Sequence, residues 1–261
     1  MPEISDIDDP RVAGFRNLPS RADPAGPRII VESELAVRRL LASSTRALAV
    51  LAVDKRAAHL DVPEDVPLYT CNQRTLDAIV GFPMHRGAIA LADRPHTGLD
   101  ALVTALAAPG IVLCASGVSD PANLGSLARN ARALGAAGLL IDPRGGDIYA
   151  RKAIRTSMGN VFAQTVVVTE IAAAIAGLER AFPALQVAAA TLSERAIDVA
   201  TFTPPDRLVL IVGNEGSGVP ADVLALAHHE LTVPMHSGAD SLNVAAASAV
   251  FLYALGLSQP R

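Results

Sequence analysis

The chain of 261 residues carries five polar side chains whose types suit the handling of a polar substrate. They are one guanidinium, one carboxylate, two amides and one hydroxyl, namely Arg129, Glu215, Asn123, Asn243 and Ser241. Each can donate or accept hydrogen bonds, and two of them carry charge at neutral pH. They fall in three loops next to apolar segments, so the elements around these loops decide whether the five can act together.

The first loop follows the apolar run 111–115 and leads into a predicted helix. Pro121 and Asn123 suit a helix start, and apolar residues then recur at helical spacing. Arg129 and Arg132 are three residues apart and therefore share one helical face. From spacing alone, a capped surface helix with two solvated arginines also explains this segment.

The second loop, residues 211–218, contains three glycines and Glu215 directly after an apolar strand. Glycines allow a backbone to turn tightly and to approach a ligand closely. Pro220 suits the start of a helix. The pattern is neither a dinucleotide fingerprint nor a P-loop, because no Lys-Ser/Thr follows the glycines. Glu215 either pairs with an arginine, fixes a neighbouring loop or is a solvated turn acid.

The third loop, residues 233–243, precedes a helix that is apolar nearly all round and is therefore expected to be buried. Ser241 is the expected N-cap of this helix. Asn243 then falls at the start of a buried helix, where an amide needs hydrogen-bond partners. Capping alone explains Ser241 better than it explains Asn243.

Strand and helix patterns alternate from residue 111 onward, which predicts an α/β fold with a mainly parallel sheet. Ligands of such sheets bind at loops beyond the carboxyl ends of the strands. The expected strands are 111–115, 138–142, 165–168, 186–190, 208–212 and 230–233. The expected helices are 123–134, 148–158, 170–181, 220–228 and 241–256.

The first part of the chain is expected to form a smaller α/β domain, with strands at 28–31 and 47–53 and a helix at 33–42. Residues 92–99 contain Pro95 and Gly98 among polar residues and mark a boundary. The predicted organisation is a flexible or irregular leader, a substrate-binding domain and a catalytic domain, at residues 1–27, 28–100 and 101–261.

The composition excludes several classes of protein. No run approaches the roughly 20 apolar residues of a membrane-spanning helix, and the acidic N-terminus is unlike a secretory signal. We therefore expect a cytoplasmic protein without a membrane partner. Cys71 and Cys114 are expected to be buried free thiols, and neither they nor the six histidines show the spacing of a metal site.

The net charge of −4 implies that any contact with nucleic acid comes from a local basic patch. Such a patch lies between residues 129 and 155, where only Asp142 and Asp147 oppose six cations. The basic residues are Arg129, Arg132, Arg144, Arg151, Lys152 and Arg155. We expect Arg132, Arg151, Lys152 and Arg155 to bind RNA.

In this order and spacing, the three loops resemble the three motifs of the SpoU-type RNA ribose methyltransferases of the SPOUT superfamily. The matching segments are 123–129 (NLGSLAR), 212–216 (VGNEG), 233–235 (VPM) and 241–243 (SLN). The resemblance covers about residues 110–258. Residues 28–92 are more loosely similar to the small RNA-binding domain that precedes many members.

This resemblance implies a deep trefoil knot in the C-terminal domain, S-adenosylmethionine held bent in the knot, and a homodimer. It places Gly213, Val233, Met235 and Leu242 on the cofactor. It places Asn123, Arg129, Glu215, Ser241 and Asn243 at the reacting centre. Family members also tend to place active-site and RNA-contacting residues near 155–160, although the pattern varies there.

The implied reaction is methyl transfer to a ribose 2′-hydroxyl, in ribosomal RNA or, as the alternative, in transfer RNA. The transfer needs an in-line approach and loss of the hydroxyl proton. A guanidinium has a pKa above about 12, so we expect Arg129 to hold phosphate and stabilise charge rather than act as a base. Ser241 and Asn243 would orient the ribose, and Glu215 would fix the loop or Arg129.

Two other functions are open at this point. A non-catalytic RNA-binding protein of the same fold would share the loops, although the complete set of five polar residues argues against it. A nucleotide-dependent oxidoreductase would share the α/β architecture, but the chain lacks a dinucleotide fingerprint.

Overall fold

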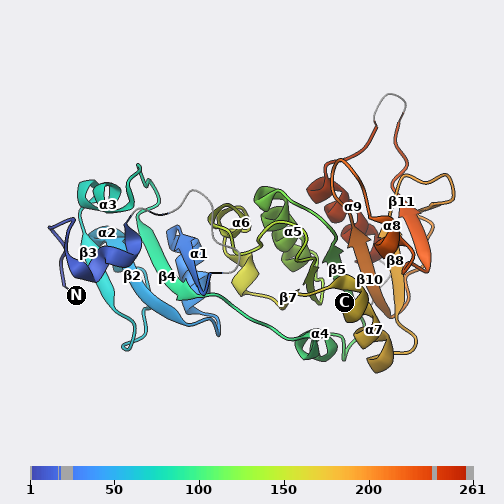
Figure 1. Ribbon diagram of the computed structural model, residues 1–261, viewed down its shortest axis with the longest axis horizontal. Helices are drawn as coiled ribbons and strands as arrows, with labels where there is room; N and C mark the ends of the chain where they lie inside the picture. The colour runs from blue at the N-terminus through green and yellow to red at the C-terminus, as the bar shows by residue number, and fades with distance from the viewer. Residues whose placement is uncertain (1, 17, 19–25, 237–239, 257–261) are drawn as a thin grey trace. The chain divides into compact units, whose positions relative to one another are not determined.

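The structure, a computed structural model, describes residues 2–16, 18, 26–236 and 240–256 (Figure 1). The chain forms two compact units. Unit 1 consists of Met1–Pro95 and Tyr149–Ala163, and unit 2 consists of His96–Ile148 and Gln164–Arg261. The segment Tyr149–Ala163 thus packs with the N-terminal unit, whereas the sequence assigned it to the catalytic domain.

Unit 1 contains a four-stranded mixed sheet with the strand order β1-β4-β2-β3. Its elements are β1 (Arg28–Glu32), α1 (Glu34–Leu41), β2 (Ala47–Val53), α2 (Asp54–Ala57), β3 (Leu68–Cys71), α3 (Gln73–Val80), β4 (Ala88–Asp93), α6 (Arg151–Thr156) and the 3-10 turn η2 (Asn160–Phe162). Polar side chains cap the two longer N-terminal helices, because Ser33 accepts from the amide of Ala36 and Asn72 from that of Thr75.

The described part of the predicted leader belongs to the core of unit 1. Ile4, Val12 and Phe15 are buried in one apolar cluster with residues of β2, β4 and α3. Val12 and Phe15 lie within a 3-10 helix, η1 (Pro10–Phe15), which Asp9 caps. The N-terminal segment is therefore irregular but packed where it is described, while residues 19–25 lie outside the described part.

Unit 2 contains a seven-stranded sheet in the order β7-β6-β5-β10-β8-β11-β9, and all its strand pairs are parallel. The strands are β5 (Gly110–Ala115), β6 (Gly138–Ile141), β7 (Val166–Val168), β8 (Gln186–Ala190), β9 (Ile197–Asp198), β10 (Arg207–Val212) and β11 (His229–Thr232). The predicted α/β fold with a mainly parallel sheet is confirmed. β5 and β10 are continuous buried runs because helices cover parallel sheets on both faces.

The helices of unit 2 are α4 (Leu99–Ala105), α5 (Pro121–Ala133), α7 (Ile171–Ala181), α8 (Ala221–Leu224) and α9 (Val244–Gly256). The predicted helix 220–228 is a single turn, because the chain turns from it into β11. α5 packs on α9, and the Asn130 amide donates to the Ala245 carbonyl (2.7 Å) and the Ser248 hydroxyl (3.0 Å). The predicted trefoil knot stays a prediction.

Within the described residues, no helix is long and apolar enough to cross a membrane. The described chain also contains no cluster of three or more His, Cys, Asp or Glu side chains with the arrangement of a metal site. Cys71 and Cys114 are buried free thiols, as predicted. Burial raises the pKa of the Cys71 thiol to about 11, so this thiol is protonated at neutral pH.

Candidate functional site

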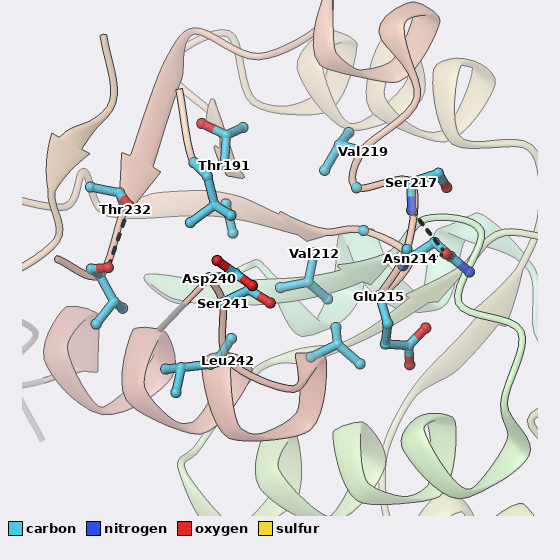
Figure 2. A pocket seen from close by; sticks show the side chains of 18 of the residues that line it. Thr191, Val212, Asn214, Glu215, Ser217, Val219, Thr232, Asp240, Ser241 and Leu242 are labelled. Carbon is cyan, nitrogen blue, oxygen red and sulfur yellow. Dashed lines mark hydrogen bonds between the residues drawn. The ribbon is translucent and has the colours of Figure 1, made fainter. Parts of the chain in front are cut away.

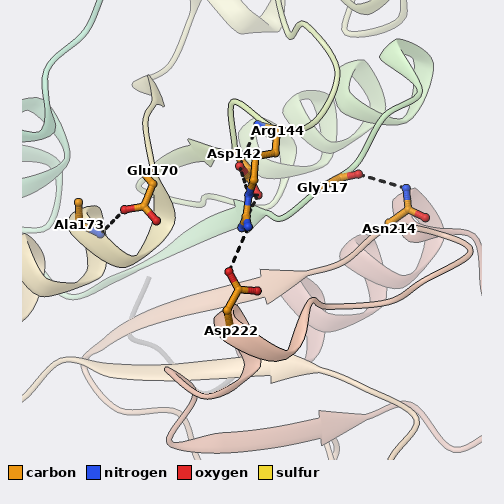
Figure 3. Close-up of polar contacts among 7 residues, drawn as sticks. All are labelled: Gly117, Asp142, Arg144, Glu170, Ala173, Asn214 and Asp222. Carbon is orange, nitrogen blue, oxygen red and sulfur yellow. Dashed lines mark hydrogen bonds and ion pairs between the residues drawn. The ribbon is translucent and has the colours of Figure 1, made fainter.

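The loops after β5 and β10 lie at the same edge of the sheet, because these neighbouring strands are parallel and paired along their length. Asn214 joins the two loops, since its side-chain amide donates to the Gly117 carbonyl at 3.1 Å (Figure 3). Its side-chain oxygen accepts from the amides of Gly216 (2.9 Å) and Ser217 (3.2 Å). Asn214 therefore sets the shape of the glycine-rich loop.

Asn214 was absent from the predicted site residues. Its position between Gly213 and Glu215 contained a usable signal, because an asparagine in a tight turn commonly accepts from amides two or three residues later. The bond to Gly117 is a contact across 97 residues and has no local signal.

Gly213 is required by the packing of this loop on itself. A Cβ at this position would overlap the backbone of Gly218 and Val219. Gly218 has a φ of +70°, in the left-handed region that favours glycine. The two backbone hydrogen bonds between Asn214 and Gly218 (3.0 and 2.9 Å) close the turn. The loop therefore forms the tight turn that its glycines led us to expect, and its backbone lies at the wall of the cavity described below.

Three of the predicted catalytic residues form one chain of hydrogen bonds. The Asn123 amide of α5 donates to the Glu215 carboxylate of the glycine-rich loop. The Asn243 amide of the third loop donates to the Asn123 side-chain oxygen at 3.2 Å. Residues that are 92 and 120 positions apart in sequence are thus joined. Of the alternatives for Glu215, the structure supports the one in which it fixes a neighbouring loop.

Asn243, and not Ser241, caps α9. The helix starts at Val244, and the Asn243 side chain accepts from the amide of Ala245 at 2.9 Å while its carbonyl accepts from that of Ala247. The predicted cap at Ser241 is wrong because the chain becomes helical three residues later than expected. Capping explains one oxygen of Asn243, and the contact with Asn123 explains its amide group.

A cavity of about 460 Å³ lies between the glycine-rich loop and the third loop. All four predicted cofactor residues line it: Gly213, Val233, Met235 and Leu242. Glu215 and Ser241 also line it, and Figure 2 shows the side chains of both loops around this space. Its volume is in the range of small-molecule sites. Residues 237–239 of the third loop lie outside the described part.

Arg129 and Arg132 both point from α5 into solvent. Neither forms a hydrogen bond or ion pair with the described part of the chain, and neither lines the cavity. The structure therefore does not join Arg129 to the other predicted catalytic residues by a direct contact.

Arg144 differs from these two arginines because it bridges two carboxylates (Figure 3). It pairs with the buried Asp142 at 3.1 Å and with Asp222 of α8 at 3.0 Å. Hydrogen bonds to these acids raise the pKa of Arg144, and the hydrogen bond to Arg144 lowers the pKa of Asp222. This arginine joins the end of β6 to α8 and is not an open cation of the predicted basic patch.

The other basic residues predicted to bind RNA lie on α6 in unit 1. Arg151 forms an ion pair with the buried Glu32 and stacks over the Phe82 ring at 4.9 Å. Lys152 and Arg155 are exposed, and Arg155 lies 3.9 Å from Glu32. Arg151 is thus held inside unit 1, while Lys152 and Arg155 face solvent.

Comparisons with known proteins identify the family of this chain. Residues 110–253 match the family model described as the SpoU rRNA Methylase family. The uncharacterized tRNA/rRNA methyltransferase of Mycobacterium tuberculosis is 32% identical, over 96% of this chain and 90% of that protein. The 23S rRNA (guanosine(2553)-2′-O)-methyltransferase RlmP of Bacillus subtilis is 26% identical, over 98% of this chain and 99% of that protein.

Solved structures show the same fold. The SpoU methyltransferase AviRb from Streptomyces viridochromogenes superposes with a TM-score of 0.78 at 21% identity, covering 88% of this chain and 89% of that chain. The family match spans the glycine-rich loop, the third loop and the start of α9, which all contribute residues to the lining of the cavity. This chain belongs to the SpoU rRNA methylase family.

Proposed function

We propose that this protein transfers a methyl group from S-adenosylmethionine to a ribose 2′-hydroxyl of ribosomal RNA. The observation that carries the proposal is the hydrogen-bonded chain Glu215–Asn123–Asn243 beside a cavity lined by the glycine-rich loop. Fixed polar groups next to a small-molecule cavity are what an oriented two-substrate reaction requires. Membership of the family gives the reaction class.

The cavity suits a nucleoside cofactor. A Cβ at Gly213 would overlap the backbone of the loop, so only glycine fits at this position. The tight turn that results allows backbone groups to face the cavity. Val233, Met235 and Leu242 supply apolar surface for a flat base. S-adenosylmethionine, when bound, supplies a methyl group attached to a positively charged sulfur. Gly213 and these three residues would hold it.

The remaining polar residues act on the RNA. Asn123 is held by Glu215 and in turn holds Asn243, so their amides are oriented before the substrate arrives. The guanidinium of Arg129, which has no partner among the described residues, would grip a phosphate in two places and stabilise the charge that develops on the ribose oxygen. The Ser241 hydroxyl, at the wall of the cavity, would orient the ribose.

The ribosomal substrate rests on RlmP, which is named for a ribose of 23S rRNA and matches this chain over nearly the full length of both proteins. Transfer RNA is the second candidate, because the M. tuberculosis relative is named for either RNA. A non-catalytic protein of the same fold would have no need for the oriented amides of Asn123 and Asn243.

A transfer assay separates these candidates. Purified protein would be titrated with S-adenosylmethionine in a calorimeter, and then incubated with the radiolabelled cofactor and unmodified ribosomal or transfer RNA. We expect cofactor binding and label in ribosomal RNA alone. Label in transfer RNA alone would change the substrate, and binding of RNA without any label would favour the non-catalytic protein.

We also propose a homodimer, because α9 exposes two apolar side chains. Val250 is 40% exposed and Tyr253 is 58% exposed, and residues three apart lie on one helical face. A second copy of the chain could cover these two side chains, because identical subunits most often pair about a twofold axis.

A further inference from the structure

The connection between β6 and β7 is anchored in unit 1, although both strands belong to the sheet of unit 2. This connection contains Tyr149–Ala163, with α6 and η2, and within unit 1 α6 packs on β1 while η2 packs on α1. The chain therefore leaves the sheet of unit 2, passes through unit 1 and returns to a neighbouring strand. Neither the proposed cofactor site nor the hydrogen-bonded chain uses it.

One anchor of the connection is a buried ion pair. Glu32, at the end of β1, is 5% exposed, and Arg151 of α6 pairs with its carboxylate while stacking on Phe82. A buried carboxylate that loses its partner is strongly destabilising, because the lone charge is then left out of water. The ion pair therefore commits α6 to unit 1.

The second anchor is a turn in an unusual conformation. Met158 has a φ of +55° and Gly159 a φ of +79°, both in the left-handed region. A non-glycine residue remains there only when its surroundings hold it, and such residues cluster at functional sites. Arg39 of α1 supplies the hold, because its guanidinium donates to the Met158 carbonyl at 2.6 Å.

Gly159 adds a steric requirement to this turn. A Cβ at this position would lie 2.8 Å from Cα and 3.3 Å from the carbonyl oxygen of Ala36. The turn thus touches the backbone of α1 as closely as only glycine permits. Its own amides are bonded, since Gly159 donates to Ile154 (2.9 Å), Asn160 to Ser157 (3.0 Å) and Phe162 to Gly159 (3.1 Å).

From these contacts we infer that Arg39 and Gly159 are positioning residues, through which the N-terminal unit sets the conformation of the β6–β7 connection for methyl transfer. The inference rests on the proposed function. Strained backbone needs a reason, and the connection also carries the exposed cation Arg155 next to the turn. An N-terminal unit that binds RNA would then control how this segment is presented when RNA is bound.

The test compares Arg39→Met with Arg38→Met in the full-length protein. Arg38 is the matched control, because it is the preceding arginine of the same helix and is exposed without a partner in the described chain. Arg39→Met should speed hydrogen exchange at the amides of Gly159, Asn160 and Phe162 by on the order of tenfold, since local opening becomes easier. Arg38→Met should leave this exchange unchanged.

Turnover on RNA is the second readout. Arg39→Met should lower kcat by about tenfold with little change in the Kd of S-adenosylmethionine, because the displaced segment is outside the cofactor cavity. Arg39→Lys should recover part of the kcat, since an ammonium also donates to a carbonyl. Gly159→Ala should reproduce the loss of kcat without removing a charge from the surface of unit 1.

The outcomes are separable. Unchanged hydrogen exchange in Arg39→Met overturns the inference. An equal loss of kcat in Arg38→Met also overturns it, because it indicates that the loss of positive charge, and not the contact with Met158, lowers kcat. If Gly159→Ala does not fold, the Arg39→Met and Arg39→Lys pair decides. A wild-type protein that never methylates RNA overturns the proposed function and the coupling with it, while exchange still tests the hold on the turn.

Discussion

At the scale of single residues, the arginines of the predicted basic patch have different environments. Arg144 is neutralised by Asp142 and Asp222, and Arg151 by Glu32. Arg129 has no such partner in the described chain. A guanidinium that is already paired binds phosphate weakly, because the existing pair must be given up first. Arg132 is unpaired in the described residues as well, so pairing alone leaves both arginines of α5 as candidates, and the resemblance to the family's first motif is what points to Arg129.

Replacing Arg129 with alanine should lower turnover by on the order of 10²–10³, comparable with the loss of one oxyanion donor. Cofactor affinity should stay nearly unchanged, because Arg129 does not line the cavity. Arg129→Lys should rescue poorly, since an ammonium cannot reproduce a two-point grip on phosphate. Single-turnover kinetics at saturating cofactor would measure all variants.

Arg132→Ala is the control for this prediction, because Arg132 is exposed on the same helix and also unpaired in the described residues. It should reduce RNA affinity only modestly. Normal turnover in Arg129→Ala, or an equal loss in both variants, would contradict the assignment of charge stabilisation to Arg129.

At the scale of elements, the strands of unit 2 followed from sequence because buried parallel strands are long apolar runs. β10, with Leu208–Ile211 fully buried, is such a run. The two-residue strand β9 had no pattern of its own, and the start of α9 was misplaced because Ser241 and Asn243 are both good caps. Hydrophobic patterns in the sequence therefore locate helices and strands, but they do not show which of two neighbouring polar residues caps a helix.

The membership of Tyr149–Ala163 in unit 1 could not be predicted from the sequence. It depends on Glu32, Arg39 and Phe82, which lie far away along the chain and contact the segment only in the folded unit. The hydrogen bond between Asn123 and Glu215 could not be predicted from the sequence either. The resemblance placed both residues in one site but did not indicate that they contact each other. Long-range packing, and not local propensity, sets these contacts.

The glycine-rich loop provides a matched pair of substitutions. Gly213→Ala would force a Cβ into the backbone of Gly218, whereas a Cβ at Gly216 would meet only the Asn214 side-chain oxygen at 3.5 Å. We expect Gly213→Ala to weaken S-adenosylmethionine binding by at least about tenfold, because the loop must open to relieve the overlap. Gly216→Ala should bind within about threefold of the wild type.

Titration calorimetry on both variants would test this expectation, with thermal melting to show that both are folded. Equal affinities would mean that the tight turn at Gly213 is unimportant for the cofactor. A loss in Gly216→Ala alone would move the contact from Gly213 to Gly216, which also lines the cavity.

At the scale of the whole molecule, the two units divide the proposed work. Unit 2 contains the cavity and the hydrogen-bonded chain of Glu215, Asn123 and Asn243. Unit 1 contains the four-stranded sheet, together with the exposed cations Lys152 and Arg155 on α6. Cofactor affinity should therefore depend on unit 2, whereas RNA affinity should depend on both units, because Arg129 and Arg132 of α5 belong to unit 2.

The proposed dimer can be tested at α9. Tyr253→Glu would place a charge on the exposed apolar face and should raise the dimer dissociation constant by at least about tenfold, because a buried unpaired charge is costly. Val168→Glu is the control, since Val168 is 45% exposed on the edge strand β7 of the same unit. Sedimentation equilibrium would compare both variants with the wild type, and a wild-type chain that stays at 27.0 kDa at micromolar concentration would remove the dimer.

The central claim, that the methyl group goes to a ribose 2′-oxygen of ribosomal RNA, is tested most directly by the product. Ribosomal RNA labelled by the protein from radioactive S-adenosylmethionine would be digested completely with alkali, which cleaves only next to a free 2′-hydroxyl. The claim predicts label in alkali-resistant dinucleotides, and its loss in Arg129→Ala. Label released in alkali-sensitive mononucleotides would mean methylation of a base and would contradict the claim.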